Sequence, residues 1–318
     1  MSFDVTEFLT ATQQEQEAYR DERQAERKAL IEQQDKGIME YTNDPEQYAV
    51  YLDRQARNLR YSPGNTALIM QERPEADVVL SMKEWGKLGR TVQDAERAHG
   101  IRILRPKDYK GTRKTDRISE EGEYFEAGET YSGTGFQVQM VYDLTQTTGL
   151  AYTPPSLIGQ DPEQRAVLLR NLQHGCPVPI KLSDTIPDAA RYDPQTHTLY
   201  IRPDLDESQF FLALAAESVQ ATLHNHGQNW DYRHEDFEAD AASIGYMLCR
   251  RYGIAAERSE ALSGVTGVFA ACPVEDRREM LDANRDLARS MAERLEWGLN
   301  RQTEKGRRTA PTRRQGAR

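Results

Sequence analysis

The stretch at residues 210–224, FFLALAAESVQATLH, constrains the fold of this chain more than any other segment. Apolar side chains recur along it at four-residue spacing, which predicts a single helix with one stripe facing a core. The stripe consists of Phe211, Ala215, Val219 and Leu223. Because such a helix needs other elements packed against it, we expect the surrounding chain to form a folded body.

A second face of the same helix carries small and polar side chains that are also four residues apart. They are Ala216, Gln220 and His224, with Glu217 beside the first. Zinc peptidases place their HExxH motif on such a helix, because this spacing brings two imidazoles to one side of one metal ion. Here the spacing is present, but neither Ala216 nor Gln220 supplies an imidazole.

Residues 216–224, AESVQATLH, resemble the HEIAHAKLH helix in the metallopeptidase domain of the ArdC-type antirestriction family. Residues 240–254, DAASIGYMLCRRYGI, are similar to that family's EAESVAYVVCRHFGL helix, whose first Glu is the third zinc ligand. The resemblance implies that Ala216 and Gln220 occupy the two histidine positions. It places Glu217 at the general base and Asp240 at the third ligand.

These replacements predict a domain without zinc. Ala216 has no donor atom, and the neutral amide of Gln220 is a poor ligand for zinc. Without a metal-activated water Glu217 is vestigial, so we expect no catalytic residue, no metal and no cofactor: a pseudo-metallopeptidase. Alternatively, Glu217 and Gln220 form only the polar side of an amphipathic helix.

A displaced metal site is the rival interpretation. It would use the side chains between the two helices, namely His224, His226, His234 and Glu235. However, His224 and His226 precede Gly227, where a glycine ends the helix and histidines favour its C-terminal dipole. Capping is therefore the competing role for these histidines.

A second resemblance covers most of residues 41–150. YSPGNTALIM at 61–70, KEWGKLGRTV at 83–92, GIRILRP at 100–106 and VYDLTQT at 141–147 follow the order of the family's single-stranded-DNA-binding domain. Cationic side chains that track phosphates and rings that stack on bases are the usual means of such binding. The residues implied to bind DNA are Arg57, Arg60, Tyr61, Asn65, Lys83, Trp85, Lys87, Arg90, Arg102 and Arg105. The alternative to base stacking for Trp85 is a place in the hydrophobic core.

The charge distribution bears on this DNA-binding hypothesis. The chain has a net charge of −10, yet residues 41–110 hold twelve basic and ten acidic residues, and residues 301–318 hold seven and one. At residues 93–100, QDAERAHG replaces a lysine-rich turn of the family. Fewer phosphate contacts weaken binding, more steeply as salt rises, so we expect reduced affinity.

Four regions are expected. They are a charged helical or partly disordered arm at 1–40, the DNA-binding domain at 41–150, the metallopeptidase-like domain at 156–300 and a basic disordered tail at 301–318. Asp44-Pro45 and Ser62-Pro63 each predict a helix start, the second helix running to about Glu72. Residues 107–135 read as a surface loop or hairpin, and 178–182 and 198–202 as strands.

The sequence thus predicts an α+β fold, with a small DNA-binding domain followed by a mostly helical zincin-like domain. The expected function is single-stranded-DNA binding for a mobile element, in the manner of antirestriction proteins. Two alternatives stay open: a metal-dependent hydrolase with a rearranged site, and an interaction module that holds a protein partner in the inactive cleft. Three cysteines without metal spacing, and no membrane-length apolar run, indicate a cytoplasmic protein.

Overall fold

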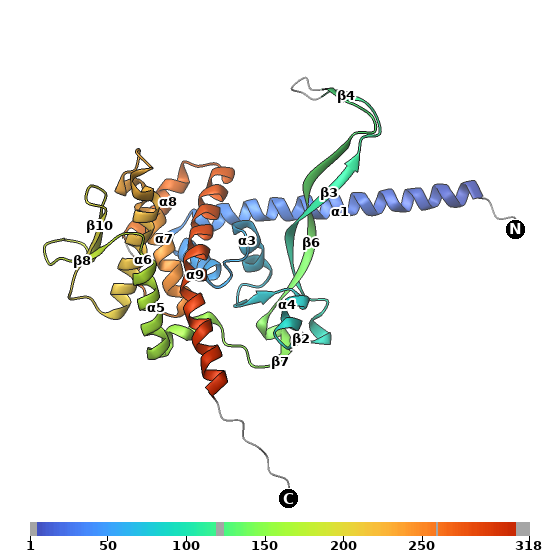
Figure 1. The fold of residues 1–318 in the computed structure, drawn as a ribbon. Helices are drawn as coiled ribbons and strands as arrows, with labels where there is room; N and C mark the ends of the chain where they lie inside the picture. The colour runs from blue at the N-terminus through green and yellow to red at the C-terminus, as the bar shows by residue number, and fades with distance from the viewer. Residues whose placement is uncertain (1–4, 119–123, 259, 310–318) are drawn as a thin grey trace, which may run out of the picture.

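The computed structural model describes residues 5–118, 124–258 and 260–309. It is an α+β structure, as the sequence predicts. The helices of residues 162–309 gather at one end, and a long two-stranded ribbon of residues 101–143 rises from the other (Figure 1). No helix in the described ranges combines the length and apolar character needed to cross a membrane.

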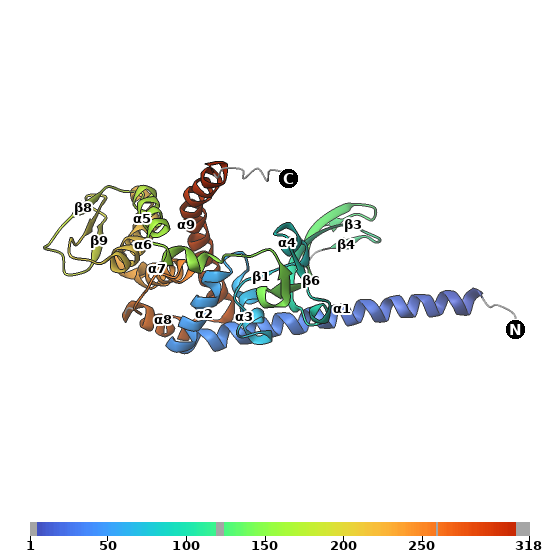
Figure 2. The same cartoon turned by 90° about the horizontal axis from the view of Figure 1, so that it is seen from below.

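Three helices open the chain: α1 (Val5–Thr42), α2 (Pro45–Arg57) and α3 (Pro63–Glu72). Helix α1 is continuous and projects far from the body (Figure 2). Its last part is not an arm, because Leu30 and Ile38 are buried in the core. The predicted starts are confirmed: the Asp44 carboxylate accepts the backbone N–H of Gln47, and the Ser62 hydroxyl accepts that of Asn65.

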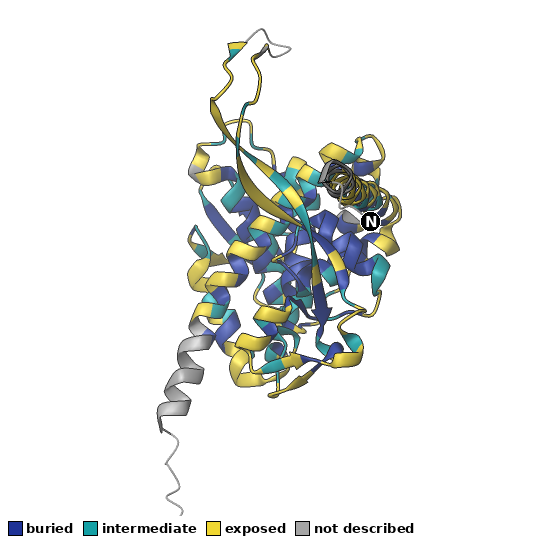
Figure 3. Ribbon diagram, turned by 90° about the vertical axis from the view of Figure 1, so that its right-hand side faces the viewer, coloured by how far each residue is buried: buried dark blue, intermediate teal, exposed yellow. Residues whose placement is uncertain are grey.

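The ribbon pairs β3 (Ile101–Thr112) with β6 (Thr130–Asp143), antiparallel from Ile101↔Val141 to Thr112↔Thr130. The predicted hairpin at 107–135 is therefore its outer half, which extends away from the body and is mostly exposed (Figure 3). Smaller elements surround its base and tip. They are β1 (Val79–Leu80), α4 (Met82–Lys87), β2 (Arg90–Val92), β4 (Arg117–Ile118), β5 (Tyr124–Phe125) and β7 (Thr147–Gly149).

The second half begins with α5 (Pro162–Gly175) and a small sheet of order β8-β10-β9. Strands β8 (Ile180–Leu182) and β10 (Thr198–Ile201) agree with the predicted strands, whereas β9 (Ala190–Asp193) was not predicted. The helices α6 (Glu207–His224), α7 (Glu238–Tyr252), α8 (Glu260–Ala270) and α9 (Val274–Thr309) follow. Helix α9 continues to Thr309 and so includes the first part of the segment for which the sequence predicts a disordered tail; residues 310–318 lie outside the described residues.

One hydrophobic cluster joins the two halves. It contains Tyr48 and Leu52 of α2 together with residues of α6, α7 and α9. The hydroxyl of fully buried Tyr48 donates to Ser243 Oγ at 3.0 Å. Arg250 of α7 also pairs with Asp53 of α2 at 2.6 Å. The predicted domains 41–150 and 156–300 therefore share one hydrophobic core.

Candidate functional site

Helix α6, which carries Ala216, Glu217 and Gln220, is capped at both ends. The Asp206 side chain accepts the N–H groups of Ser208 and Gln209, and the Gln209 side chain accepts the Asp206 N–H in return. At the other end Asn225 takes the left-handed conformation with φ 49°. Helix α6 thus ends at His224 with Asn225 as its cap, rather than at the predicted Gly227, because asparagine also tolerates the left-handed conformation.

Glu217 is held by structural contacts. Its Oε2 accepts the backbone N–H of Tyr192 in β9 at 2.6 Å. Both carboxylate oxygens lie 3.2 Å from Nε2 of His234, and only 12% of the Glu217 side chain is exposed. The predicted vestigial base therefore ties α6 to β9 and to the turn before α7. Tyr192 and His234 pack on Glu217, and both also line a pocket of about 420 Å³ together with Asp193 and Glu235.

Gln220 is fully buried, and both ends of its amide are bonded. Its Nε2 donates to the carbonyl oxygen of His234 at 3.0 Å, and its Oε1 accepts the Tyr232 hydroxyl at 2.9 Å. Burying an amide without partners is costly, so these bonds account for a glutamine inside the helix pair. Through these two hydrogen bonds, the Gln220 side chain connects α6 to the segment that precedes α7.

Ala216 and Asp240 lie in different surroundings. Ala216 lines a pocket of about 400 Å³ beside Ala242 and Tyr246 of α7. The Asp240 carboxylate instead accepts a hydrogen bond from Asn284 Nδ2 of α9 at 2.8 Å, and burial raises the pKa of this carboxyl. Among the side chains that the structure describes, no three of His, Cys, Asp or Glu gather closely enough to hold a metal ion. The residues at the four positions do not fit a catalytic zinc.

The histidines of the predicted displaced site make separate contacts. The His224 ring stacks on Tyr232 with 4.7 Å between centroids, and its Nδ1 lies 2.7 Å from the Tyr192 hydroxyl. His234 faces Glu217 as described, Glu235 is exposed, and the His226 side chain lies outside the described residues. Sequence reasoning missed Tyr192 and Tyr232, which surround this site, because neither falls in a motif or on a periodic stripe.

Three of the predicted DNA-binding residues are in the core. Trp85 is fully buried and its Nε1 donates to the Tyr142 carbonyl oxygen at 2.8 Å. Tyr61 is 8% exposed and its hydroxyl donates to Val79 O. Asn65, also buried, bonds both the N–H and the carbonyl of Leu104 in β3. The prediction of stacking surfaces at Tyr61 and Trp85 is therefore corrected, since neither ring has a free face for a base.

Four of the predicted DNA-binding arginines form ion pairs or hydrogen bonds within the protein. Arg57 pairs with Asp77, Arg60 with Glu84 and Arg102 with Glu72. The Arg90 guanidinium donates to Thr147 and to the carbonyl oxygen of Leu150. The remaining three, Lys83, Lys87 and Arg105, are exposed and have no acidic partner within the described ranges.

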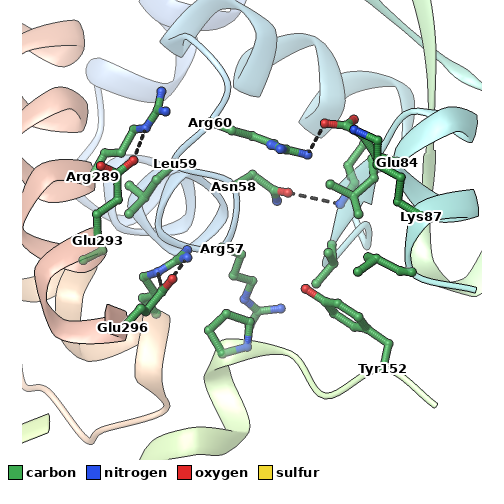
Figure 4. Close-up of a pocket in the computed structure, with 17 residues that line it drawn as sticks. Arg57, Asn58, Leu59, Arg60, Glu84, Lys87, Tyr152, Arg289, Glu293 and Glu296 are labelled. Carbon is green, nitrogen blue, oxygen red and sulfur yellow. Dashed lines mark hydrogen bonds and ion pairs between the residues drawn. The ribbon is translucent and has the colours of Figure 1, made fainter. Parts of the chain in front are cut away.

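Arg57, Arg60 and Lys87 line a pocket of about 470 Å³ between α2, α4 and α9. Figure 4 shows Arg60 directed at Glu84 and Arg289 directed at Glu293 of the same helix. Glu296 of α9 pairs with Arg251 of α7. The pocket is therefore a network of opposite charges, with Lys87 as its unpaired cation among the described residues.

The fold and site together define a class: an α+β protein that carries a projecting β-ribbon and a helical body whose central helix pair, in the described part of the chain, lacks metal ligands. No protein-family model matches the chain, and no curated protein matches it in sequence. Two solved structures are similar to it in fold, both of the antirestriction protein ArdC from plasmid R388. The metal-free structure gives a TM-score of 0.46 at 19% identity, covering 76% of this chain and 86% of that one. The Mn(II)-bound structure gives 0.40 at 16% identity, covering 78% and 97%.

Proposed function

We propose that this chain binds single-stranded DNA through its first half, in the service of a mobile element, and that its helical body does not hydrolyse peptides. The observation that carries the proposal is the set of exposed cations that have no acidic partner in the described ranges, Lys83, Lys87 and Arg105. They lie in a segment with a basic excess, within a chain of net charge −10. A cation that is not neutralised by a neighbour is free to contact a phosphate.

The motifs at 61–106 and 141–147 support DNA as the polyanion, because their resemblance to the ArdC family implies a single-stranded-DNA-binding domain. The structure limits how such binding takes place. With Trp85 and Tyr61 buried, phosphate contacts from Lys83 and Lys87 of α4 contribute charge but no stacking. Binding through these lysines alone is therefore weak and depends strongly on salt.

The lack of peptidase activity rests on Glu217. Its carboxylate is occupied by the Tyr192 N–H and by His234, and the neighbouring positions Ala216 and Gln220 supply no metal ligand. A general base without an activated water has no nucleophile to deprotonate. Within the described residues, no observation favours a rearranged hydrolase site.

The test is fluorescence anisotropy with an unstructured labelled oligonucleotide of about 16 nucleotides, starting at about 50 mM salt. We expect saturable binding with an association constant whose logarithm falls linearly with the logarithm of salt. Lys83→Gln with Lys87→Gln should flatten that slope by about 0.7 for each phosphate that is no longer neutralised. The matched control is Lys181→Gln, an exposed lysine of β8 without an ion pair in the described ranges, which should leave the slope unchanged. Absence of binding by the unaltered protein at the lowest salt would overturn the proposal.

A further inference from the structure

The β3–β6 ribbon gathers cations and rings on one of its two faces. Side chains alternate along a strand, so Arg105, Lys107 and Tyr109 of β3 share a face. Directly opposed residues lie on the same face, and Tyr131 of β6 stands opposite Gly111, two positions beyond Tyr109. The strand register therefore brings Tyr109 and Tyr131 together, although they are far apart in the sequence.

Glycines opposite the two tyrosines allow their rings to lie across the ribbon. Tyr109 is paired with Gly133, where an added Cβ would stand 2.7 Å from the tyrosine hydroxyl. Tyr131 is paired with Gly111, where an added Cβ would stand 2.6 Å from Tyr131 Cζ. The two rings meet edge to face, with 6.2 Å between their centroids. A larger residue at either glycine would displace the ring from this position.

These rings are held in place yet remain open to solvent. Tyr109 is 48% and Tyr131 41% exposed. Arg113 adds a guanidinium 5.3 Å from the centroid of the Tyr131 ring. An aromatic ring held on a backbone surface with an exposed face offers a platform on which a planar group stacks at little cost in side-chain entropy.

The paired strands that carry this platform have a positive net charge. Residues 101–112 and 130–141 contain four basic residues and one acidic residue, and at the outer end of the pairing Arg113 is paired with Glu129 at 3.6 Å. Arg105 and Lys107, on the tyrosine face, are exposed and have no acidic partner among the described residues. The opposite face is directed at α1, because Leu104 packs in one cluster with Leu30. The acidic helix α1 thus lies against the other face of the ribbon at Leu104.

We propose that the face of the ribbon bearing Arg105, Lys107, Tyr109 and Tyr131 is a binding site for single-stranded DNA, with bases stacked on the two rings and phosphates against the two cations. This inference rests on the proposed function and assigns its stacking surface, in place of the buried Tyr61 and Trp85. A single strand fits better than a duplex, because its bases can leave their own stack and present a free π-face.

The test compares full-length variants in the anisotropy assay, with the single-stranded oligonucleotide and its duplex. Tyr109→Leu with Tyr131→Leu should lower affinity for the single strand about ten-fold or more, as expected when stacked bases lose their ring partners. Tyr109→Phe with Tyr131→Phe keeps both rings and should bind as the unaltered protein does. The matched control is Tyr19→Leu, since Tyr19 is a 58%-exposed tyrosine on α1. Lys107→Gln, which leaves both rings, should flatten the salt slope by about 0.7.

The outcomes separate the two proposals. If the unaltered protein binds and the double leucine variant binds equally well, the ribbon site is overturned while the proposed function stands. The ribbon site is also overturned if the phenylalanine pair loses as much affinity as the leucine pair, or if the duplex binds as tightly as the single strand. If the unaltered protein does not bind, both proposals fail. Should the leucine variant not fold, judged by far-UV circular dichroism, an unchanged salt slope in Lys107→Gln overturns the site.

Discussion

Replacing Glu217 by alanine is expected to destabilise the protein by about 2–6 kcal/mol. The change removes the acceptor of the Tyr192 N–H at 2.6 Å and of His234 Nε2 at 3.2 Å. Tyr192 is 1% and His234 8% exposed, so water cannot replace the lost carboxylate freely. Leaving a buried donor without a partner costs about 1–3 kcal/mol, and two such donors give the stated range.

Equilibrium urea unfolding, followed by far-UV circular dichroism, measures this effect as a lower transition midpoint at similar slope. Glu235→Ala is the matched control, because Glu235 is an exposed carboxylate near the same site, and it should stay within about 0.5 kcal/mol of the unaltered protein. A working general base behaves differently, since removing a catalytic group often leaves stability unchanged or raises it. If Glu217→Ala unfolds at the same urea concentration as the control or higher, the structural role assigned to Glu217 is wrong.

Two further substitutions test other parts of the structure. Trp85→Phe should lower the free energy of unfolding by about 1–3 kcal/mol, because the Tyr142 carbonyl oxygen loses its buried donor. The affinity for DNA should stay unchanged. A variant with reduced DNA affinity and unchanged stability would contradict the core role of Trp85. Asp240→Asn should raise the melting temperature at pH 7. Burial raises the pKa of Asp240 in the folded state, so the stability contributed by its protonated form is lost as the pH rises through that pKa. The advantage of the asparagine variant should therefore grow as the pH rises from about 4, the ordinary pKa of an aspartate, through the raised pKa of Asp240, and a constant or reversed difference would contradict this assignment.

Local signals were predictable from the sequence. The helix starts at Asp44 and Ser62 follow from short-range capping patterns, and the structure places side-chain bonds there. The end of α7 at Gly253 has the left-handed backbone, φ 68°, that the glycine indicates. Such features depend on a few neighbouring residues, and a single sequence contains all of them.

Pairings between distant residues were not predictable. Arg102 is neutralised by Glu72, thirty positions earlier, and Glu217 is bonded to the backbone of Tyr192, whose strand was not expected. The sequence leaves both a core role and a stacking role open for Trp85, because a buried and an exposed tryptophan cannot be distinguished without knowing which residues cover the ring. The Tyr109–Gly133 pair likewise depends on a strand register that periodicity alone does not fix.

The shared hydrophobic cluster has a practical consequence for anyone who divides this protein into fragments. A truncated product that stops at residue 150 would leave the aromatic side of α2, including Tyr48 and Tyr51, without the helices that shield it. Tyr48 would also lose Ser243, and Asp53 would lose Arg250. Exposed aromatic surface of this kind promotes aggregation. Assigning activities to the two halves therefore calls for point substitutions in the intact chain rather than excision.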